Sequence, residues 1–206
     1  MAGPRGVRLV IDWLVVGLGN PDKEYELSPH NIGFMVIDQL AERCGARVKR
    51  RSWRARARTG EAEIEGRQVL LAKPQTYMNR SGEAVRPLLE KSSLTAGSLI
   101  VVYDDHDLPW RTLRIRQRGS AGGHRGMESV IRSIETDEFT RVRLGIDTGS
   151  SRADPAYLLK PMGREQRKEL EDFLGQAAQA VASIITEGAE KAMTRFNRRA
   201  PGIEDE

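Results

Sequence analysis

LVIDWLVVGL, residues 9–18, is the apolar run from which the fold can be worked out, and Gly19 follows it at once. An almost unbroken apolar run that stops at a tight, glycine-containing turn is typical of a strand buried on both faces of a sheet. After a polar loop, residues 32–44 carry apolar side chains at helical spacing and stop at Gly45, which indicates a helix. A buried strand followed by a helix predicts the first unit of an α/β fold.

Strands and helices continue to alternate beyond this unit. A hairpin is expected around Glu65-Gly66, and Ser81 is suited to be the N-cap of a helix. The expected ranges are strands at 56–64, 68–72, 99–103, 112–117 and 142–146, and helices at 81–91, 124–134 and 164–196. The pattern predicts an α/β fold: a single-domain three-layer sandwich with a mixed, mostly parallel twisted sheet flanked by helices. We place the domain at residues 1–200 and expect residues 201–206 (PGIEDE) to form a disordered tail.

The composition excludes several classes of protein. Hydrophobic residues make up 39% and charged residues 30% of the 206, which is ordinary for a globular domain with a sizeable core. No apolar run approaches the roughly 18 residues that a membrane span requires, and no signal peptide is recognisable. A single cysteine, Cys44, cannot form an internal disulfide and suits a reducing compartment. We therefore expect a cytoplasmic protein without a membrane partner.

The charge distribution favours a polyanionic partner. The formal net charge is +4, and arginines cluster at 47–58, at 111–118 and near the end of the chain. A planar guanidinium can hold a phosphate through two hydrogen bonds, which a point charge cannot do. For the first and last clusters, a solvated surface is an equally good interpretation.

Polar residues follow three of the expected strands. His30 lies in the loop after the first strand, Asn79 follows the hairpin, and Asp104 comes directly after the central strand. Because ligands bind outside the carboxyl ends of strands in open α/β sheets, these side chains could converge. Each also has a purely structural interpretation as a cap of a helix or turn.

The three side chains together would make sensible chemistry. The imidazole of His30 could take a proton from water, since its reference pKa of about 6.5 lies near operating pH. Asp104 could fix the tautomer of that ring, and Asn79 could donate to a developing oxyanion or hold the water. No serine or cysteine nucleophile accompanies the set, so direct attack by water is the simpler mechanism.

Other ligand motifs are incomplete. Residues 17–22 lack the third glycine of a dinucleotide fingerprint, and residues 119–126 lack the Gly-Lys-Ser/Thr ending of a P-loop. We interpret the latter as a mobile wall of the crevice and His124 as structural. Asp104 to Asp107 resemble a metal cluster, but adjacent strand residues point to opposite faces and no second cluster supplies ligands. We expect neither a metal nor a cofactor.

Several stretches, in this order, resemble the bacterial-type peptidyl-tRNA hydrolase family. They are GLGNPDKEYELSPHNIGF (17–34), KPQTYMNRSGEAV (73–85), YDDHDLP (103–109), GSAGGHRGMESVI (119–131) and FTRVRLGI (139–146). Separate motifs at compatible spacing are far more specific than any single loop. The resemblance implies a monomeric, metal-independent cytoplasmic enzyme that frees tRNA from peptides lost by stalled ribosomes.

The resemblance also implies roles for individual residues. His30 would be the general base, Asp104 its partner, and Asn20 the residue that senses whether the amino group is blocked. The implied substrate contacts are Met78 and Asn79 in the cleft, Tyr25 and Tyr77 at the tRNA 3′ end, and Arg116 and Arg143 at the tRNA 5′ phosphate.

Arg125 is the main departure from the family pattern, which usually has asparagine at this position. An arginine could still donate to a phosphate or carbonyl of the substrate, so we expect activity to survive. The alternative from a different class is a non-catalytic RNA-binding relative on the same fold. Retention of His30, Asp104, Asn79 and Asn20 speaks against it, because a pure binder needs no base and no orienting acid.

Overall fold

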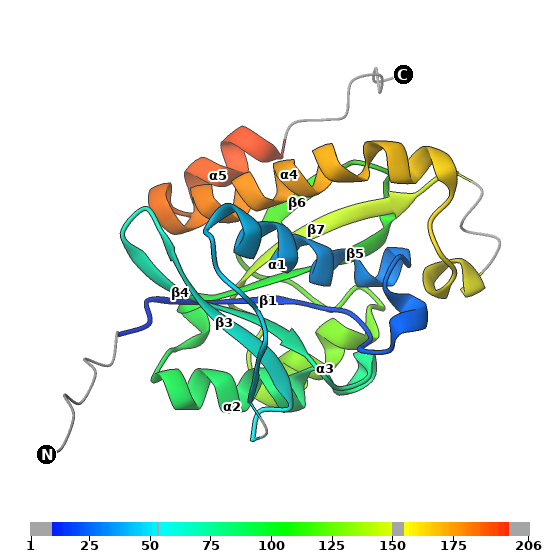
Figure 1. Ribbon diagram of the computed structural model, residues 1–206. Coiled ribbons are helices and arrows are strands. Elements are labelled where there is room, and N and C mark those ends of the chain that lie inside the picture. Colours follow the sequence, from blue (N-terminus) through cyan, green and yellow to red (C-terminus); the bar gives the residue numbers. More distant parts are fainter. Residues whose placement is uncertain (1–9, 53, 150–154, 198–206) are drawn as a thin grey trace, which may run out of the picture.

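The computed structural model describes residues 10–52, 54–149 and 155–197, and the expected tail at 201–206 lies outside these ranges. Within them, one sheet contains the strands in the order β2-β3-β4-β1-β5-β7-β6 (Figure 1). The strands are β1 (Trp13–Gly17), β2 (Arg50–Ser52), β3 (Ala57–Ile64), β4 (Arg67–Pro74), β5 (Leu99–Pro109), β6 (Leu113–Arg116) and β7 (Thr140–Asp147). The helices are α1 (Ile32–Arg43), α2 (Gly82–Ser92), α3 (Arg125–Ile134), α4 (Arg164–Glu187) and α5 (Ala189–Phe196). Short 3-10 helices are η1 (Lys23–Tyr25), η2 (Pro29–Asn31), η3 (Met78–Arg80), η4 (Ala96–Ser98) and η6 (Pro155–Leu159).

The centre of the sheet is parallel and its edges are antiparallel. β1 pairs in parallel with β4 and with β5, and β5 pairs in parallel with β7. β2, β3 and β4 pair antiparallel in sequence, and β6 pairs antiparallel with β7. Leu14, Val15 and Val16 of β1 are fully buried, as an apolar run in a sheet covered on both faces requires. The expected α/β sandwich with a mixed sheet is confirmed.

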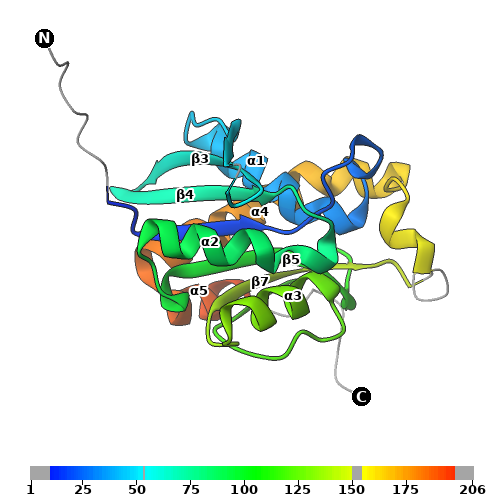
Figure 2. The same ribbon diagram turned by 90° about the horizontal axis from the view of Figure 1, so that it is seen from below.

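The two faces of the sheet are covered by different helices. Along β5, Leu99, Val101 and Tyr103 belong to the core shared with α2 and α3, whereas Ile100 and Val102 belong to the core shared with α1, α4 and α5. This alternation is the period of two that a strand dictates. Figure 2 shows α2 and α3 on the near side of the strands and α4 and α5 on the far side. Among the described residues, no helix is both long and apolar enough to cross a membrane.

Several element boundaries differ from the sequence prediction. β5 continues to Pro109, so Asp104 to Pro109 belong to the strand and not to a loop after it. The reason is that β7 continues beside it and pairs with Asp104 and Asp105. The expected C-terminal helix is divided at Gly188, whose positive φ of 89° ends α4. Ser81 does occupy the N-cap position of α2, but its hydroxyl donates to the Met78 carbonyl oxygen and does not cap.

Two glycines let α1 approach the sheet at the end of β1. A Cβ on Gly17 would lie 2.1 Å from the carbonyl oxygen of Gly33, and a Cβ on Gly33 would lie 2.4 Å from that of Val102. No real side chain tolerates such distances from backbone, so only glycine fits at either position. The start of α1 is thereby held against the ends of β1 and β5. Since η2 directly precedes α1, this contact also brings His30 to β5.

Candidate active site

His30, Asp104 and His124 meet at the middle of β5, where Asp104 lies. Nδ1 of His30 lies 2.9 Å from both carboxylate oxygens of Asp104, and Nε2 of His124 lies 3.0 Å from Oδ1 of the same group. The side chains of His30, Asp104 and His124 are 12%, 3% and 7% exposed. The cluster is therefore almost excluded from solvent, and His30 is its most accessible member. The expected convergence of His30 and Asp104 is observed. The ring of His124 bonds directly to Asp104, a contact that the sequence did not predict, and the interpretation of His124 as structural stays a prediction.

The hydrogen-bond pattern assigns the tautomers. Nδ1 of His124 accepts a bond from the backbone N–H of Met127 and caps α3, so the proton of this ring sits on Nε2 and is donated to Asp104. For His30, the carboxylate accepts the Nδ1 proton, which leaves the lone pair of Nε2 free. This is the arrangement that a general base needs.

Burial and charge act in opposite directions on the pair. Burial on its own would lower the pKa of His30, but the charge of Asp104 and the hydrogen bond to it outweigh burial and raise that pKa above its ordinary value. Arg125 works in the opposite direction and lowers the pKa of His30. Burial would likewise raise the pKa of Asp104, yet the two histidines hold it well below its usual range. Asp104 therefore stays ionised, and His30 becomes a base above its raised pKa.

Asn20 connects two segments beside the cluster. Its backbone N–H donates to Oδ1 of Asn31 at 2.8 Å, and Nδ2 of Asn31 donates to the Asn20 carbonyl oxygen at 2.9 Å. The side-chain Oδ1 of Asn20 accepts the backbone N–H of Met78 at 2.9 Å. The Asn20 side chain thus fixes η3 relative to the loop after β1, and within the described ranges no hydrogen bond is found for its amide nitrogen. Sequence reasoning did not identify Asn31, whose short side chain at the start of a helix gave no distinct signal.

The remaining predicted substrate contacts lie on η1, on η3 and at Tyr77, which directly precedes η3. Met78 is buried and packs in the core formed with α2 and α3. Asn79 is exposed, and no side-chain hydrogen bond is found for it among the described residues, so its predicted role stays a prediction. Tyr77 is 59% exposed. The hydrogen bond and the charge of Glu24 raise the pKa of Tyr25 above its ordinary value.

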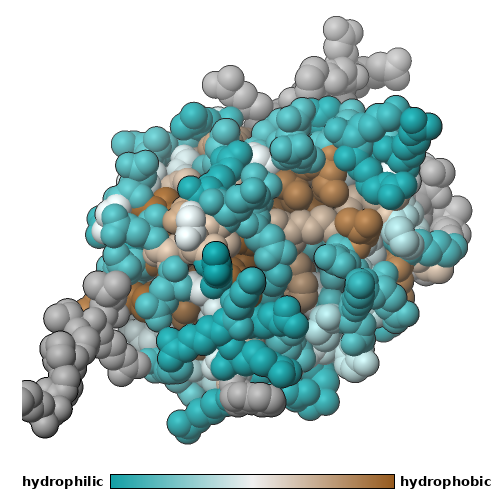
Figure 3. All heavy atoms as spheres, in the orientation of Figure 1, coloured by the Kyte–Doolittle hydropathy of each residue, from teal (hydrophilic) through white to brown (hydrophobic). Residues whose placement is uncertain are grey.

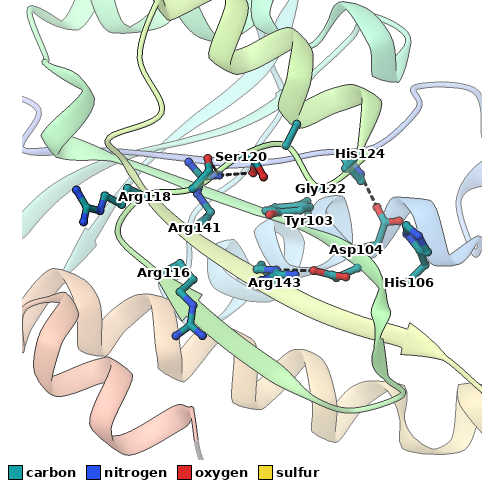
Figure 4. A pocket seen from close by; sticks show the side chains of 13 residues that line it. Tyr103, Asp104, His106, Arg116, Arg118, Ser120, Gly122, His124, Arg141 and Arg143 are labelled. Atoms are coloured by element: carbon teal, nitrogen blue, oxygen red, sulfur yellow. Dashed lines mark hydrogen bonds and ion pairs between the residues drawn. The ribbon is translucent and has the colours of Figure 1, made fainter.

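A basic cavity of about 220 Å³ adjoins Asp104 and His124 (Figure 4). It lies between the middle of β5, the end of β6, the first half of β7 and the glycine-rich loop, and its arginines are Arg116, Arg118, Arg141 and Arg143. Arg143 is paired with the buried carboxylate of Asp105, so part of its charge is compensated. Arg116 and Arg118 are exposed, and they are the cations of this cavity most available to a ligand.

A second cavity, of about 500 Å³, begins at Asn20 and Asn31 and follows α1. Its apolar lining consists of Leu27, Phe34, Met35 and Leu174. On the face seen in Figure 3, apolar residues show through between hydrophilic ones over α1 and α4. Its charged lining holds four carboxylates and three cations: Asp22, Glu26, Asp38, Glu42, Lys23, Arg58 and Lys73. Asp104 and His124 thus line the basic cavity directly, whereas the mixed, partly apolar cavity reaches the neighbourhood of the cluster through Asn20 and Asn31.

Most of the described arginines at 47–58 lie away from the second cavity, which only Arg58 of this cluster lines. Arg50, Arg51 and Arg54 line a cavity of about 690 Å³ together with Val10 and Ile11, at the amino end of the sheet strand β1. Arg50 is paired with Glu61 at 3.5 Å on an exposed surface. Both interpretations of this cluster, a solvated surface and a phosphate contact, stay open.

The histidine–aspartate cluster also has the composition of a metal site. One ligand atom each from His30, Asp104 and His124 lie within 4.8 Å of one another. The run Asp104 to Asp107 does not converge, as the strand period predicted: Asp104 bonds the histidines, and Asp105 bonds Arg143. Both histidines face the carboxylate of Asp104, so a metal would have to replace these bonds.

The family model, the similar sequences and the similar solved structures described below point to the same family. A family model described as peptidyl-tRNA hydrolase matches residues 14–203. The peptidyl-tRNA hydrolase of Solibacter usitatus is 53% identical over 195 residues, covering 94% of this chain and 98% of that protein. That of Koribacter versatilis is 45% identical over 188 residues, covering 90% and 92%. The crystal structure of peptidyl-tRNA hydrolase from Acinetobacter baumannii matches with a TM-score of 0.84 at 29% identity, covering 96% of this chain and all of that one. This chain belongs to the peptidyl-tRNA hydrolase family.

Proposed function

We propose that this enzyme hydrolyses the ester bond between a peptidyl, or N-blocked aminoacyl, group and the 3′ ribose of tRNA. The family supports the substrate, and the cluster of His30, Asp104 and His124 supports the chemistry. The observation that carries the proposal is the geometry of His30: its Nδ1 faces a buried carboxylate at 2.9 Å, and its Nε2 has no hydrogen-bond partner among the residues that the structure describes.

The reaction needs one proton to be moved twice. Nε2 of His30 takes a proton from a water molecule, whose oxygen attacks the ester carbonyl and forms a tetrahedral intermediate. Asp104 stabilises the imidazolium that results. When the intermediate collapses, the bond to the 3′ oxygen breaks, and His30 returns the proton to that oxygen. The products are a peptide with a free carboxyl group and a tRNA with a free 3′ hydroxyl.

The two cavities suggest how the substrate lies. The tRNA would be on the basic side, where Arg116 and Arg143 contact phosphate, and the peptide would lie toward Asn20 and the cavity along α1. Asn20 has a free amide donor that can bind the carbonyl of a blocked amino group. The further substrate contacts that we propose are Tyr25, Tyr77, Met78, Asn79 and Arg125.

The proposed enzyme acts as a cytoplasmic monomer with no cofactor. Because His30, Asp104 and His124 also have the composition of a metal site, we propose to assay the enzyme after dialysis against a chelator. Retained activity supports a water molecule activated by His30 alone, whereas activity that returns only with added metal would overturn it.

The decisive experiment is the His30→Ala variant on N-acetylaminoacyl-tRNA. Loss of a general base reduces turnover by about 10²- to 10⁴-fold, while binding of tRNA should remain close to that of the wild type. His106→Ala is the histidine control: His106 is exposed, is paired with Asp107 at 3.4 Å and lines the basic cavity, so its loss should change tRNA binding at most and leave turnover at saturating substrate unchanged. Turnover of His30→Ala near that of the wild type would exclude the mechanism, and a wild type that binds tRNA without releasing the acyl group would favour the non-catalytic alternative.

A further inference from the structure

Arg141, the second residue of β7, is a buried arginine whose donors face the backbone. The residue is only 1% exposed. Its Nη1 donates to the carbonyl oxygens of Gly119 and Ser120 at 2.6 and 3.0 Å, and its Nη2 donates to that of Asp137 at 2.7 Å. The guanidinium carbon also lies 4.5 Å from the centre of the Phe139 ring. Figure 4 shows this side chain beneath the loop that carries Ser120 and Gly122.

This arrangement is costly for a merely structural residue. A buried charge loses its hydration, and in the described part of the chain no carboxylate is hydrogen-bonded to Arg141 in return. Its Nε is buried without a hydrogen-bond partner in that same part. An apolar side chain would fill this space at a lower desolvation cost. What an apolar side chain cannot do is bind the two loop carbonyls.

The loop that Arg141 binds is rich in glycine. Gly119, Gly122 and Gly123 all have positive φ angles, of 147°, 55° and 76°. Glycines lose more conformational entropy on ordering than other residues, so this loop needs an anchor to hold one conformation. The two carbonyl contacts supply one at Gly119 and Ser120, and His124 follows only four residues later.

His124 transmits the position of the loop to the base. It bonds Asp104 at 3.0 Å, and its ring lies 5.1 Å from that of His30 and 4.9 Å from that of Tyr103. Asp104 in turn bonds His30. We propose that Arg141 is a positioning residue for ester hydrolysis: by binding the carbonyls of Gly119 and Ser120 it keeps His124 on Asp104, and so keeps Asp104 on His30.

This role differs from that of the other arginines around the cavity. Both hydrogens of Nη1 are used by the loop, and the guanidinium is buried, so Arg141 is not placed to bind a phosphate. Arg116 lies opposite it in register on β6 and is exposed. Loss of Arg116 should therefore weaken binding, whereas loss of Arg141 should slow the reaction itself.

The inference rests on the proposed function and is tested by steady-state kinetics of Arg141→Met on N-acetylaminoacyl-tRNA. We expect kcat to fall by about tenfold or more, towards the hundredfold that a displacement of about 1 Å can cost, with a much smaller change in KM. The acidic limb of the pH profile should move to higher pH, because Asp104 without the His124 bond stabilises the His30 imidazolium more strongly. A loss of folded protein alone would leave the shape of that profile unchanged.

Arg114→Met is the matched control. Arg114 lies on β6, and its Nε is likewise buried without a partner in the described part of the chain, but it does not line the cavity with the glycine-rich loop. We expect it to keep the wild-type kcat and pH profile. Equal losses of kcat in both variants would overturn the inference.

A double-mutant cycle with His124→Ala tests the route. If Arg141 acts through His124, the double variant turns over within about twofold of His124→Ala alone, whereas independent roles would make the two losses multiply. Should Arg141→Met fail to fold, Arg141→Lys decides the question. It keeps the charge but not the planar fork, so a reduced kcat with the same pH shift is expected, and wild-type kinetics would refute the role. A wild-type enzyme inactive on this substrate would instead refute the proposed function, so the two failures are distinguishable.

Discussion

Replacement of Asp104 by asparagine tests the centre of the mechanism with almost no change of shape. The carboxylate accepts from His30 and from His124, and its side chain is 3% exposed, so water cannot substitute for it. Asparagine removes the charge and offers one acceptor oxygen to two donors. One of the two histidines must then face an N–H₂ group in place of an oxygen.

The size of the effect follows from these contacts. A hydrogen bond to a charged group contributes about 1.5–3 kcal/mol, which corresponds to about 10- to 150-fold in rate when it is lost only from the transition state. If the amide also reverses the tautomer of His30, the loss approaches the ~10⁴-fold known for an aspartate-to-asparagine change in a serine-protease triad. We therefore expect kcat to fall by about 10²- to 10⁴-fold.

The assay is single-turnover release of the labelled acyl group from N-acetylaminoacyl-tRNA, with tRNA binding measured separately. Asp105→Asn is the matched control, because Asp105 is also a buried carboxylate of β5 but pairs with Arg143 and not with a histidine. We expect its rate at saturating substrate to stay within about threefold of the wild type. A loss below tenfold for Asp104→Asn in folded protein, or equal losses for the two variants, would refute the reasoning.

Three further predictions concern the pH profile, tRNA binding and stability. Activity should rise with pH through the raised pKa of His30. Because Arg125 lowers that pKa, Arg125→Asn should raise it further and move the acidic limb of the kcat/KM profile to higher pH. An unchanged acidic limb would show that Arg125 does not act on His30. Arg116→Ala should weaken tRNA binding and reduce the slope of log K against log salt by about one, with little change at saturation; a loss confined to turnover would contradict a phosphate contact. Gly33→Ala should lower the free energy of unfolding by about 1–3 kcal/mol in urea titrations, whereas Gly97→Ala, whose Cβ would meet nothing closer than 3.6 Å, should cost far less.

Local sequence determined most of the architecture. The apolar run of β1, the helical spacing of α1 and the turn at Glu65-Gly66 each predicted the observed element, because burial on two faces, amphipathicity and turn chemistry are properties of short segments. Boundaries set by neighbours were missed. The continuation of β5 past Tyr103 depends on pairing with β7, which no window along β5 contains.

The sequence by itself also determined the family and pointed to His30 and Asp104, since their motifs are contiguous and specific. Only the tertiary structure placed His124 on Asp104, because the two residues are 20 positions apart and the contact depends on how the glycine-rich loop is folded. The tertiary structure likewise distinguishes the environments of the arginines. Arg116 and Arg141 are similar in sequence context, yet one is exposed and the other is buried against loop carbonyls, since β6 is the edge strand of the sheet and β7 lies inside it. Local sequence patterns therefore identify the candidate catalytic side chains, and tertiary packing determines which of them form hydrogen bonds with one another.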